Sequence, residues 1–178
     1  MILIFSFTPF LFGCFLAGSL AQAWIFVLLR NEQAKGFQLF QLPIIVTEQV
    51  PEKLGSTIDP IRSLLDEIIV INKSSFSCAR DSRFMQKVGT LKKVDGIILV
   101  GIETHVCVYQ TERDLIDRGY HVEVVADASG ARNEDNHRVA LDRIQLNDGF
   151  LTTTEMLLFQ LQGQAEGDRF RQLVKLIK

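Results

Sequence analysis

The chain has 178 residues, of which 47% are hydrophobic and 22% are charged. This length is typical of one domain and lets the chain bury about 70% of the surface that it exposes when unfolded, so the core needs no disulfide or metal. The composition excludes wholesale disorder. A net charge of −2 and a pI near 5.9 lack the basic excess of a nucleic-acid binder, so we expect no nucleic-acid partner.

Residues 1–29 contain no charged side chain, and Arg30 is the first. This length would suit a membrane span, and Ala21-Gln22-Ala23 resembles a signal-peptidase site. However, a proline and two glycines interrupt the run, and no positive charge precedes it, which favours a buried first strand and an apolar helix of an α/β core. A start of the chain that is not the native one is a third interpretation. Any membrane contact is therefore expected only through residues 1–29.

The three cysteines, Cys14, Cys78 and Cys107, are odd in number and widely spaced. They form neither a disulfide framework nor a metal-binding CxxC pair, which is typical of a reducing compartment. A cytoplasmic location is therefore expected. The alternative is a membrane-associated or exported protein, if residues 1–29 act as an anchor or signal.

Strand-like and helix-like segments alternate after residue 40. The predicted strands are residues 42–47, 67–71, 96–101, 121–126 and 150–153, and the clearest helices are 106–118, ended by Gly119, and 133–147. Because the strands are apolar on both faces, they indicate a parallel sheet covered on two sides. We therefore predict one doubly wound, three-layer α/β/α domain over residues 1–178. No nucleotide-binding glycine motif and no metal-ligand spacing occurs, so no cofactor is expected.

Two polar segments follow predicted strands at the edge where such sheets carry their chemistry. Cys107 lies where the helix after 96–101 begins, and the positive helix end favours a thiolate there. The same backbone amides could hold an oxyanion. Lys73 follows the strand 67–71, at the same edge, where its ammonium would stabilise a thiolate or an anionic substrate. The alternatives are a buried core cysteine and a solvated lysine.

Other side chains of these segments point to a substrate pocket but not to a Cys–His pair. The residues expected to face the pocket are Phe76, Glu103, Thr104 and His105, although Glu103 could instead make a structural hydrogen bond. His105 is only two residues from Cys107, so the two side chains point in different directions. His121 and His137 are expected to be structural or on the surface.

An ordered set of segments resembles the isochorismatase-like cysteine hydrolases, and the eukaryotic isochorismatase domain-containing proteins in particular. The segments are PIIVTEQ (43–49) with LG (54–55), KSSFS (73–77), GIETHVCV (101–108), LIDRG (115–119), VVADAS (124–129), TTTE (152–155) and the C-terminal 170–178. The likeness runs from about residue 42 to the C-terminus, and GIETHVCV at a strand end is its most specific part.

This resemblance implies a six-stranded, mainly parallel sheet and an Asp–Lys–Cys triad that hydrolyses a small amide, ester or vinyl ether. It makes Cys107 the nucleophile and Lys73 the triad lysine, with the amides of Val106 and Cys107 as the oxyanion hole. It also implies a non-proline cis peptide near Ile102-Glu103, and homo-oligomers. No metal is expected, since residues 47–51 lack the histidine that metal-binding relatives carry there.

The aspartate of the triad has no counterpart in this sequence. Counting back one βαβ unit from the second strand reaches residues 8–14, and no acidic residue occurs before Glu32. Two readings follow: a cysteine hydrolase that turns over poorly, or a catalytically impaired relative that serves in binding or assembly. The defect is confined to residues 1–40, an atypical apolar segment, which could be a substituted N-terminus on an otherwise enzymatic domain.

Overall fold

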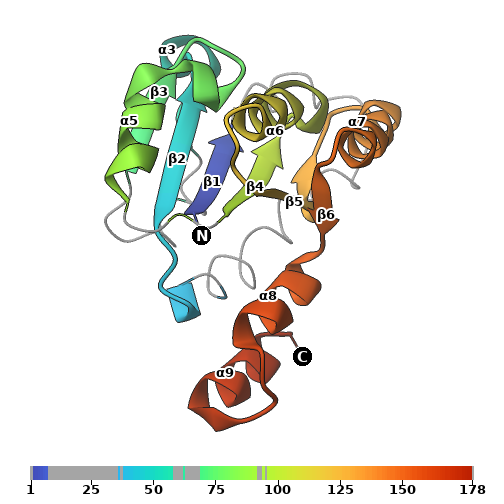
Figure 1. Cartoon of the computed structure of the whole chain (residues 1–178). Coiled ribbons are helices and arrows are strands. Elements are labelled where there is room, and N and C mark those ends of the chain that lie inside the picture. The colour runs from blue at the N-terminus through green and yellow to red at the C-terminus, as the bar shows by residue number, and fades with distance from the viewer. Residues whose placement is uncertain are drawn as a thin grey trace.

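The computed structural model describes residues 2–7, 36, 38–57, 62, 69–91, 94 and 96–177. The strands are β1 (Ile2–Phe7), β2 (Ile44–Gln49), β3 (Ile69–Lys73), β4 (Ile97–Ile102), β5 (Val122–Gly130) and β6 (Phe150–Thr152). They form one sheet in the order β3-β2-β1-β4-β5-β6, and all five pairings are parallel (Figure 1). The predicted parallel α/β fold and its six strands are therefore confirmed.

Strand β1 lies in the middle of the sheet, paired with β2 on one side and β4 on the other. This agrees with the interpretation of the apolar start as a first core strand, as far as residues 2–7 are concerned. The rest of that interpretation concerns residues 8–35, which lie outside the described residues. Among the described helices, none has the length and apolar character needed to cross a bilayer.

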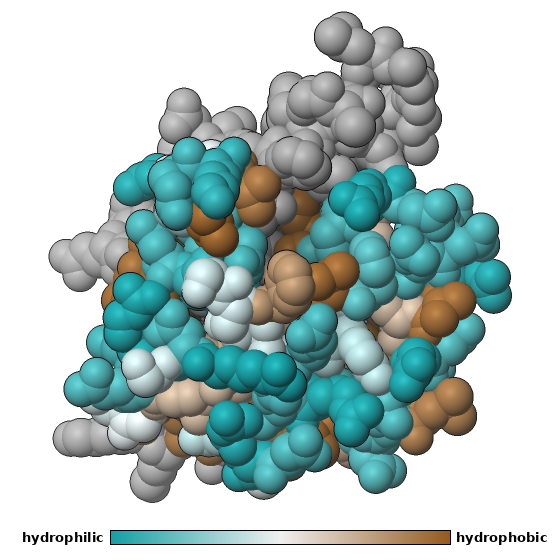
Figure 2. All heavy atoms as spheres, turned by 90° about the horizontal axis from the view of Figure 1, so that it is seen from above, coloured by the Kyte–Doolittle hydropathy of each residue, from teal (hydrophilic) through white to brown (hydrophobic). Residues whose placement is uncertain are grey.

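Helices lie between and after the strands. They are α3 (Pro51–Leu54), the 3₁₀ turn η2 (Cys78–Arg80), α5 (Ser82–Thr90), the π-turn η3 (Thr104–Val108), α6 (Tyr109–Ile116), α7 (Glu134–Leu146), α8 (Thr154–Gln162) and α9 (Gly167–Ile177). Viewed from the side toward which the strands of Figure 1 point, the molecule presents mostly hydrophilic side chains, with a small apolar group near the centre (Figure 2).

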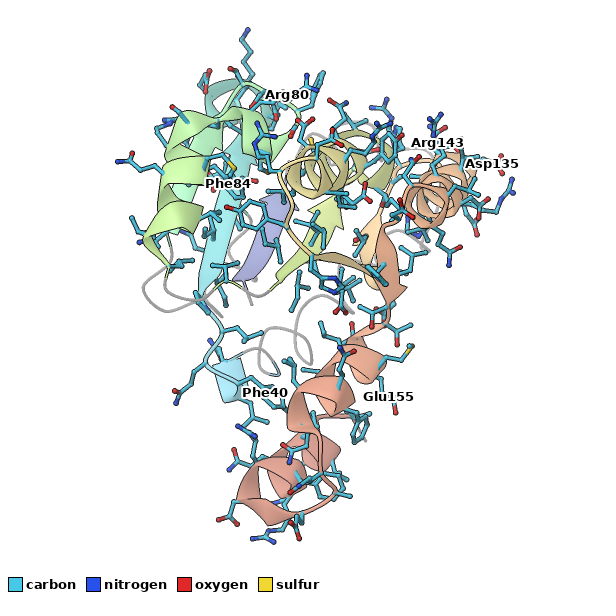
Figure 3. The ribbon with its side chains drawn as sticks, viewed as in Figure 1. Phe40, Arg80, Phe84, Asp135, Arg143 and Glu155 are labelled. Carbon is cyan, nitrogen blue, oxygen red and sulfur yellow. The ribbon has the colours of Figure 1, made fainter. Side chains whose placement is uncertain are left out.

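The two faces of the sheet bury separate apolar clusters because successive strand residues point to opposite sides. On one face, Ile45 and Leu99 pack with Phe84 of α5 and Leu115 of α6. Phe84 is fully buried and points from α5 toward β2 (Figure 3). On the other face, strand residues such as Val46 and Val100 pack with leucines of the two last helices, Leu157, Leu158 and Leu173. This is the predicted three-layer arrangement; its extent as one domain over 1–178 stays a prediction.

Strand ends differ from the sequence-based bounds in a consistent way. The predictions ended the second and third strands at residues 47 and 71, whereas β2 continues to Gln49 and β3 to Lys73. Hydrophobicity decided the predicted ends, but parallel pairing is a backbone property and extends through polar residues such as Glu48 and Asn72. The predicted helix 106–118 is two elements, because a π-turn with its wider hydrogen bonds precedes α6.

Three local predictions are confirmed. Gly119 has φ +83°, and its N–H donates to the Ile116 carbonyl at 2.8 Å while the next N–H reaches back to Leu115, which ends the helix in a Schellman motif. The helix predicted to start at residue 133 does so: α7 begins at Glu134, and the Asn133 side chain caps it by accepting from the backbone N–H of Asn136. The Ile102-Glu103 peptide bond is cis.

Candidate active site

The residues predicted to carry chemistry meet at the carboxyl ends of β2, β3 and β4. Lys73 is the last residue of β3, and Cys107 lies in η3, which follows β4 after one residue. The register of the parallel pair β2–β3 places Gln49 directly beside Lys73. Because paired residues of neighbouring strands point to the same side of the sheet, both side chains reach the same place.

Lys73 is 3% exposed, and neutral oxygens hold its ammonium. The Nζ donates to Gln49 Oε1 at 2.6 Å and to the carbonyls of Ser75 and Phe76 at 2.9 Å each. These three bonds use the three protons of the ammonium. Within the described part of the chain, none of these acceptors is a carboxylate, so the positive charge is solvated but not neutralised by them.

Cys107 is 5% exposed, and its Sγ lies 4.0 Å from the Nζ of Lys73. An ammonium at this distance favours thiolate over thiol. The thiol belongs to a π-turn, in which the Tyr109 N–H donates to the Thr104 carbonyl five residues before it. Such π-turns occur frequently at functional sites. The arrangement therefore combines a buried sulfur, a fixed positive charge and a turn of backbone amides.

The amides predicted as an oxyanion hole are partly engaged. The Val106 N–H donates to the Glu103 carbonyl at 3.1 Å, and the Val108 N–H reaches the same oxygen at 3.3 Å. For Val106 to stabilise an oxyanion, its bond to Glu103 must be exchanged for one to the substrate. The role of the Val106 and Cys107 amides as donors to an oxyanion therefore stays a prediction.

The four predicted pocket residues behave differently. The backbone carbonyl of Phe76 accepts a hydrogen bond from Lys73 Nζ, and Phe76 is 54% exposed. Glu103 Oε2 accepts from the Arg132 N–H at 3.3 Å and lies 3.6 Å from His105 Nδ1. Thr104 is fully buried, and its Oγ1 lies 2.9 Å from His137 Nδ1 on α7. The structure thus brings Glu103 and His105 together and turns the Thr104 hydroxyl toward α7; their contacts to substrate stay predictions.

Gln49 was missed by the sequence reasoning although it completes the lysine site. It is 5% exposed, accepts from Lys73 and donates through Nε2 to the Ser74 carbonyl at 2.7 Å. The available signal was its place at the carboxyl end of the predicted second strand, next to the edge that carries Lys73. The prediction ended that strand at residue 47, which left Gln49 in a loop.

The expected position of the family's aspartate also changes. The count of one βαβ unit reached residues 8–14, but β1 ends at Phe7, which pairs with Glu48 of β2. The count was too short because the crossover from β1 to β2 is longer than the minimum that was assumed. The nearest acidic residue after β1 in the sequence is still Glu32.

No metal ligand set is found among the described residues. Groups of three or more His, Cys, Asp or Glu side chains that could hold an ion do not occur in the part of the chain that the structure describes. The expectation that the protein needs no metal stays a prediction.

Replacing Gln49 by leucine should lower the free energy of unfolding by roughly 2 kcal/mol, because the variant leaves the buried Lys73 ammonium short of one acceptor. Urea unfolding of the variant measures this loss. Gln86→Leu on α5 is the matched control, since Gln86 is exposed and should change stability by less than about 0.5 kcal/mol. An equal effect of both substitutions would show that Gln49 does not support the lysine.

The fold and the site together define a parallel α/β protein with a lysine-paired cysteine at the carboxyl edge of its sheet. The chain belongs to the isochorismatase family: residues 29–156 match the isochorismatase domain. Over 151 residues it is 35% identical to the secreted isochorismatase effector Isc1 of Phytophthora sojae, which covers 83% of this chain and 72% of that protein. It is 36% identical over 137 residues to isochorismatase domain-containing protein 2 of Xenopus laevis, covering 77% of this chain but only 65% of that protein.

A solved structure with the same fold is that of the MAR1 ribonuclease from Caenorhabditis elegans. It superimposes with a TM-score of 0.82 at 31% identity and covers 99% of this chain and 88% of that one. The resemblance to isochorismatase domain-containing proteins is confirmed by these comparisons. Because the Caenorhabditis elegans protein is named a ribonuclease, the comparisons do not support the expected absence of a nucleic-acid partner. Because the Phytophthora sojae protein is named a secreted effector, the cytoplasmic location stays a prediction.

Proposed function

We propose that this chain is a cysteine hydrolase that cleaves a small amide or ester through Cys107, with the vinyl ether of relatives as a further substrate class. The observation that carries the proposal is the 4.0 Å separation of Lys73 Nζ and Cys107 Sγ, two buried groups at the carboxyl edge of the sheet. A buried lysine whose charge is held by neutral oxygens is suited to stabilise an anion beside it.

In the proposed reaction the Cys107 thiol gives its proton to water, and the Lys73 ammonium stabilises the resulting thiolate. The sulfur attacks the carbonyl carbon, a C–S bond forms, and the electron pair of the C=O bond moves to oxygen. The amides of Val106 and Cys107 are proposed to stabilise this oxyanion. Collapse expels the amine or alcohol, which takes a proton from solvent, and water then hydrolyses the thioester to the acid and the thiol.

The missing carboxylate limits this reaction. Residues 1–31 contain no Asp or Glu, and the described acceptors of Lys73 are neutral. A positioned general base is typically worth roughly 10²–10⁴-fold in rate, so we expect slow turnover. The alternative proposal is a catalytically impaired member of the family that retains the fold for binding or assembly, as a homo-oligomer.

Glu103 and His105 are proposed to contact the substrate, with Phe76 beside them. Their side chains are partly exposed, at 15% for Glu103 and 22% for His105, and their 3.6 Å contact presents a carboxylate and an imidazole together. The exposed ring of Phe76 belongs to the loop whose carbonyl groups hold Lys73. A carboxyl group and an imidazole near an aromatic ring suit a small polar substrate with an apolar part.

Selective alkylation tests the proposal without a known substrate. We expect iodoacetamide at pH 7 to modify Cys107 at least about tenfold faster than Cys78, read by peptide mass spectrometry, because Cys107 lies beside Lys73 and Cys78 lies beside Thr47. Cys78 is an internal control of similar burial, at 1% against 5% exposure, and its Sγ lies 3.4 Å from the Thr47 hydroxyl. Equal rates would favour the binding or assembly alternative.

A substrate screen completes the test. Small amides and esters are offered together with a single-stranded RNA, because a structural relative is named a ribonuclease. The net charge of −2 argues against RNA, which basic surfaces bind. Release of acid from an amide or ester supports the proposal, and cleavage of RNA alone would replace it.

A further inference from the structure

The π-turn that carries Cys107 is tied to a helix far along the chain. Its first residue, Thr104, is fully buried, and the Thr104 Oγ1 lies 2.9 Å from Nδ1 of His137, 33 residues later. Strand β4 ends at Ile102, and Thr104 begins the π-turn two residues later. Cys107 follows Thr104 by three residues. The hydrogen bond therefore holds the turn at its entrance.

The π-turn needs a stabilising side-chain contact because its backbone hydrogen bonds span more residues than those of an α-helix. The Glu103 carbonyl is shared by the N–H groups of Val106 and Val108, at 3.1 and 3.3 Å. The Tyr109 N–H reaches back five residues to Thr104. Such π geometry is rare, and neighbouring contacts have to stabilise it. A fixed Thr104 side chain sets where the turn begins, and hence where the Cys107 sulfur lies relative to Lys73.

His137 is itself well fixed. It lies in the first turn of α7, where its N–H donates to the Asn133 carbonyl at 3.1 Å and the Asn133 side chain caps the helix. Burial lowers the pKa of His137, opposed by the nearby Glu134 carboxylate, so the ring is neutral at pH 7. A neutral imidazole has one donor and one acceptor nitrogen, and either role pairs with a hydroxyl.

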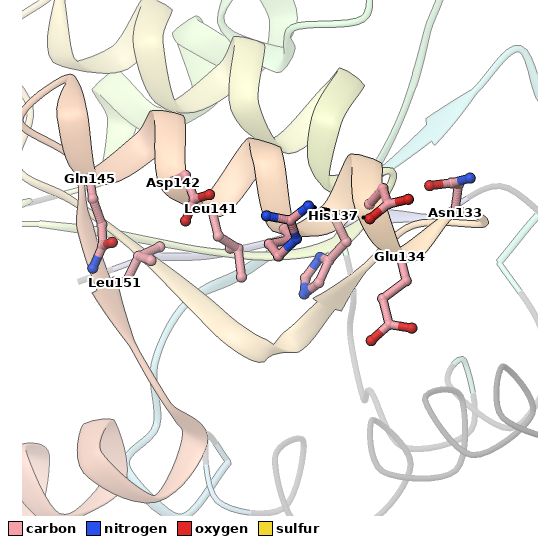
Figure 4. A pocket seen from close by; sticks show the side chains of 9 residues that line it. Asn133, Glu134, His137, Leu141, Asp142, Gln145 and Leu151 are labelled. Carbon is pink, nitrogen blue, oxygen red and sulfur yellow. Dashed lines mark hydrogen bonds and ion pairs between the residues drawn. The ribbon is translucent and has the colours of Figure 1, made fainter.

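The other side of the ring borders open space. His137 lines a hollow of about 660 Å³ along α7, beside Glu134 and Leu141 (Figure 4). An amide side chain of similar or smaller size therefore fits at position 137 without overpacking. This makes the position suitable for substitutions that move one hydrogen-bonding atom and little else.

We propose that His137 is a positioning residue, which holds the Cys107 turn in its reactive arrangement through the hydroxyl of Thr104. This role rests on the proposed Cys107 chemistry. Removing one such hydrogen bond typically corresponds to a factor of roughly 3 to 10, which is the expected loss in the alkylation rate of Cys107.

The test uses two amide variants that differ in reach. In His137→Asn an amide atom stands at the place of Nδ1, whereas in His137→Gln it stands at the place of Nε2. Alkylation of Cys107 by iodoacetamide at pH 7 is measured together with the melting temperature. We expect His137→Gln to slow alkylation by about 3- to 10-fold and His137→Asn to retain the wild-type rate. His121→Leu is the matched control, since His121 lies at the opposite end of the sheet, where its carbonyl accepts from Ile97.

Two variants of Thr104 test the other partner of the hydrogen bond and show whether a folding defect causes the change in alkylation rate. Thr104→Val should slow alkylation as His137→Gln does, Thr104→Ser should not, and the double variant should lose no more than either single one. Unchanged alkylation in His137→Gln and Thr104→Val overturns the proposal, and so does an equal loss in His137→Asn. If the wild-type protein itself shows no preference for Cys107 over Cys78, the proposed function fails before this test begins.

Discussion

Cys107→Ala is expected to lower the turnover of a small amide or ester by at least about 10³-fold, because the variant removes the sulfur that is proposed to form the covalent intermediate. The measurement is the steady-state rate with the best substrate of the screen. Cys78→Ala is the matched control: Cys78 is also buried, but it lies against Thr47 and Thr111 instead of Lys73. It should retain turnover within about twofold.

Lys73→Met tests the proposed role of the ammonium beside Cys107. Methionine keeps most of the length of the lysine but removes the charge that lies 4.0 Å from Cys107. An opposite charge at this range typically favours the ionised form by about one to three powers of ten, so turnover should fall by roughly 10- to 1,000-fold. Retained turnover in Cys107→Ala would contradict the role of the sulfur, and retained turnover in Lys73→Met alone would contradict that of the ammonium.

The second large effect concerns the buried carboxyl group of Glu112. Glu112 lies in α6 and is 0% exposed, and neither carboxyl oxygen has a hydrogen-bond partner within the described structure. Burial raises its pKa from 4.5 to about 7, with Arg113 opposing and Asp117 adding to the shift. The carboxyl group packs against Gly149, where a Cβ would also come within 2.8 Å of the Ile144 carbonyl. The space around it is therefore too tight to supply a new partner.

Glu112→Gln should remove a pH dependence of stability. Between pH 4.5 and 7 the folded protein binds the proton that the unfolded chain has lost, so the free energy of unfolding falls as pH rises. A shift from 4.5 to about 7 corresponds to about 3 kcal/mol, which is lost in full above pH 7. At pH 8 the variant should therefore be more stable than the wild type by up to about 3 kcal/mol, and at pH 4 nearly equal to it.

Urea unfolding at pH 4, 6 and 8 measures this difference. Glu155→Gln is the matched control, because Glu155 is exposed on α8 (Figure 3) and its charge is solvated in both states. Parallel stability curves for wild type and Glu112→Gln would show that the carboxyl group does not carry a proton in the folded protein at neutral pH.

Local pattern determined much of the candidate site as well as the fold. The polar residues after two apolar strands predicted that Lys73 and Cys107 share one edge of a parallel sheet, and they lie 4.0 Å apart. This works because all strands of such a sheet run in one direction, so their carboxyl ends meet. Gly119 marked a helix end for a similar reason, since its φ requirement acts within a few residues.

The partners of these residues were decided by the tertiary structure. Gln49 reaches Lys73 because the register of β2 and β3 aligns them, and hydrophobic pattern predicts that a strand exists without setting its register or its last polar residues. Thr104 meets His137 because α7 packs beside the π-turn, and Glu112 loses its hydration because α6 is covered from the side of Gly149.

The sequence by itself thus determined the alternating α/β order, the family and the edge at which Lys73 and Cys107 lie, all of which depend on periodicity and on short motifs. Only the tertiary structure decided which polar groups hold the lysine, which helix anchors the cysteine turn and which carboxyl group is buried without a partner. These contacts join segments 24 to 37 residues apart, and their geometry depends on register and packing. No local pattern encodes either quantity.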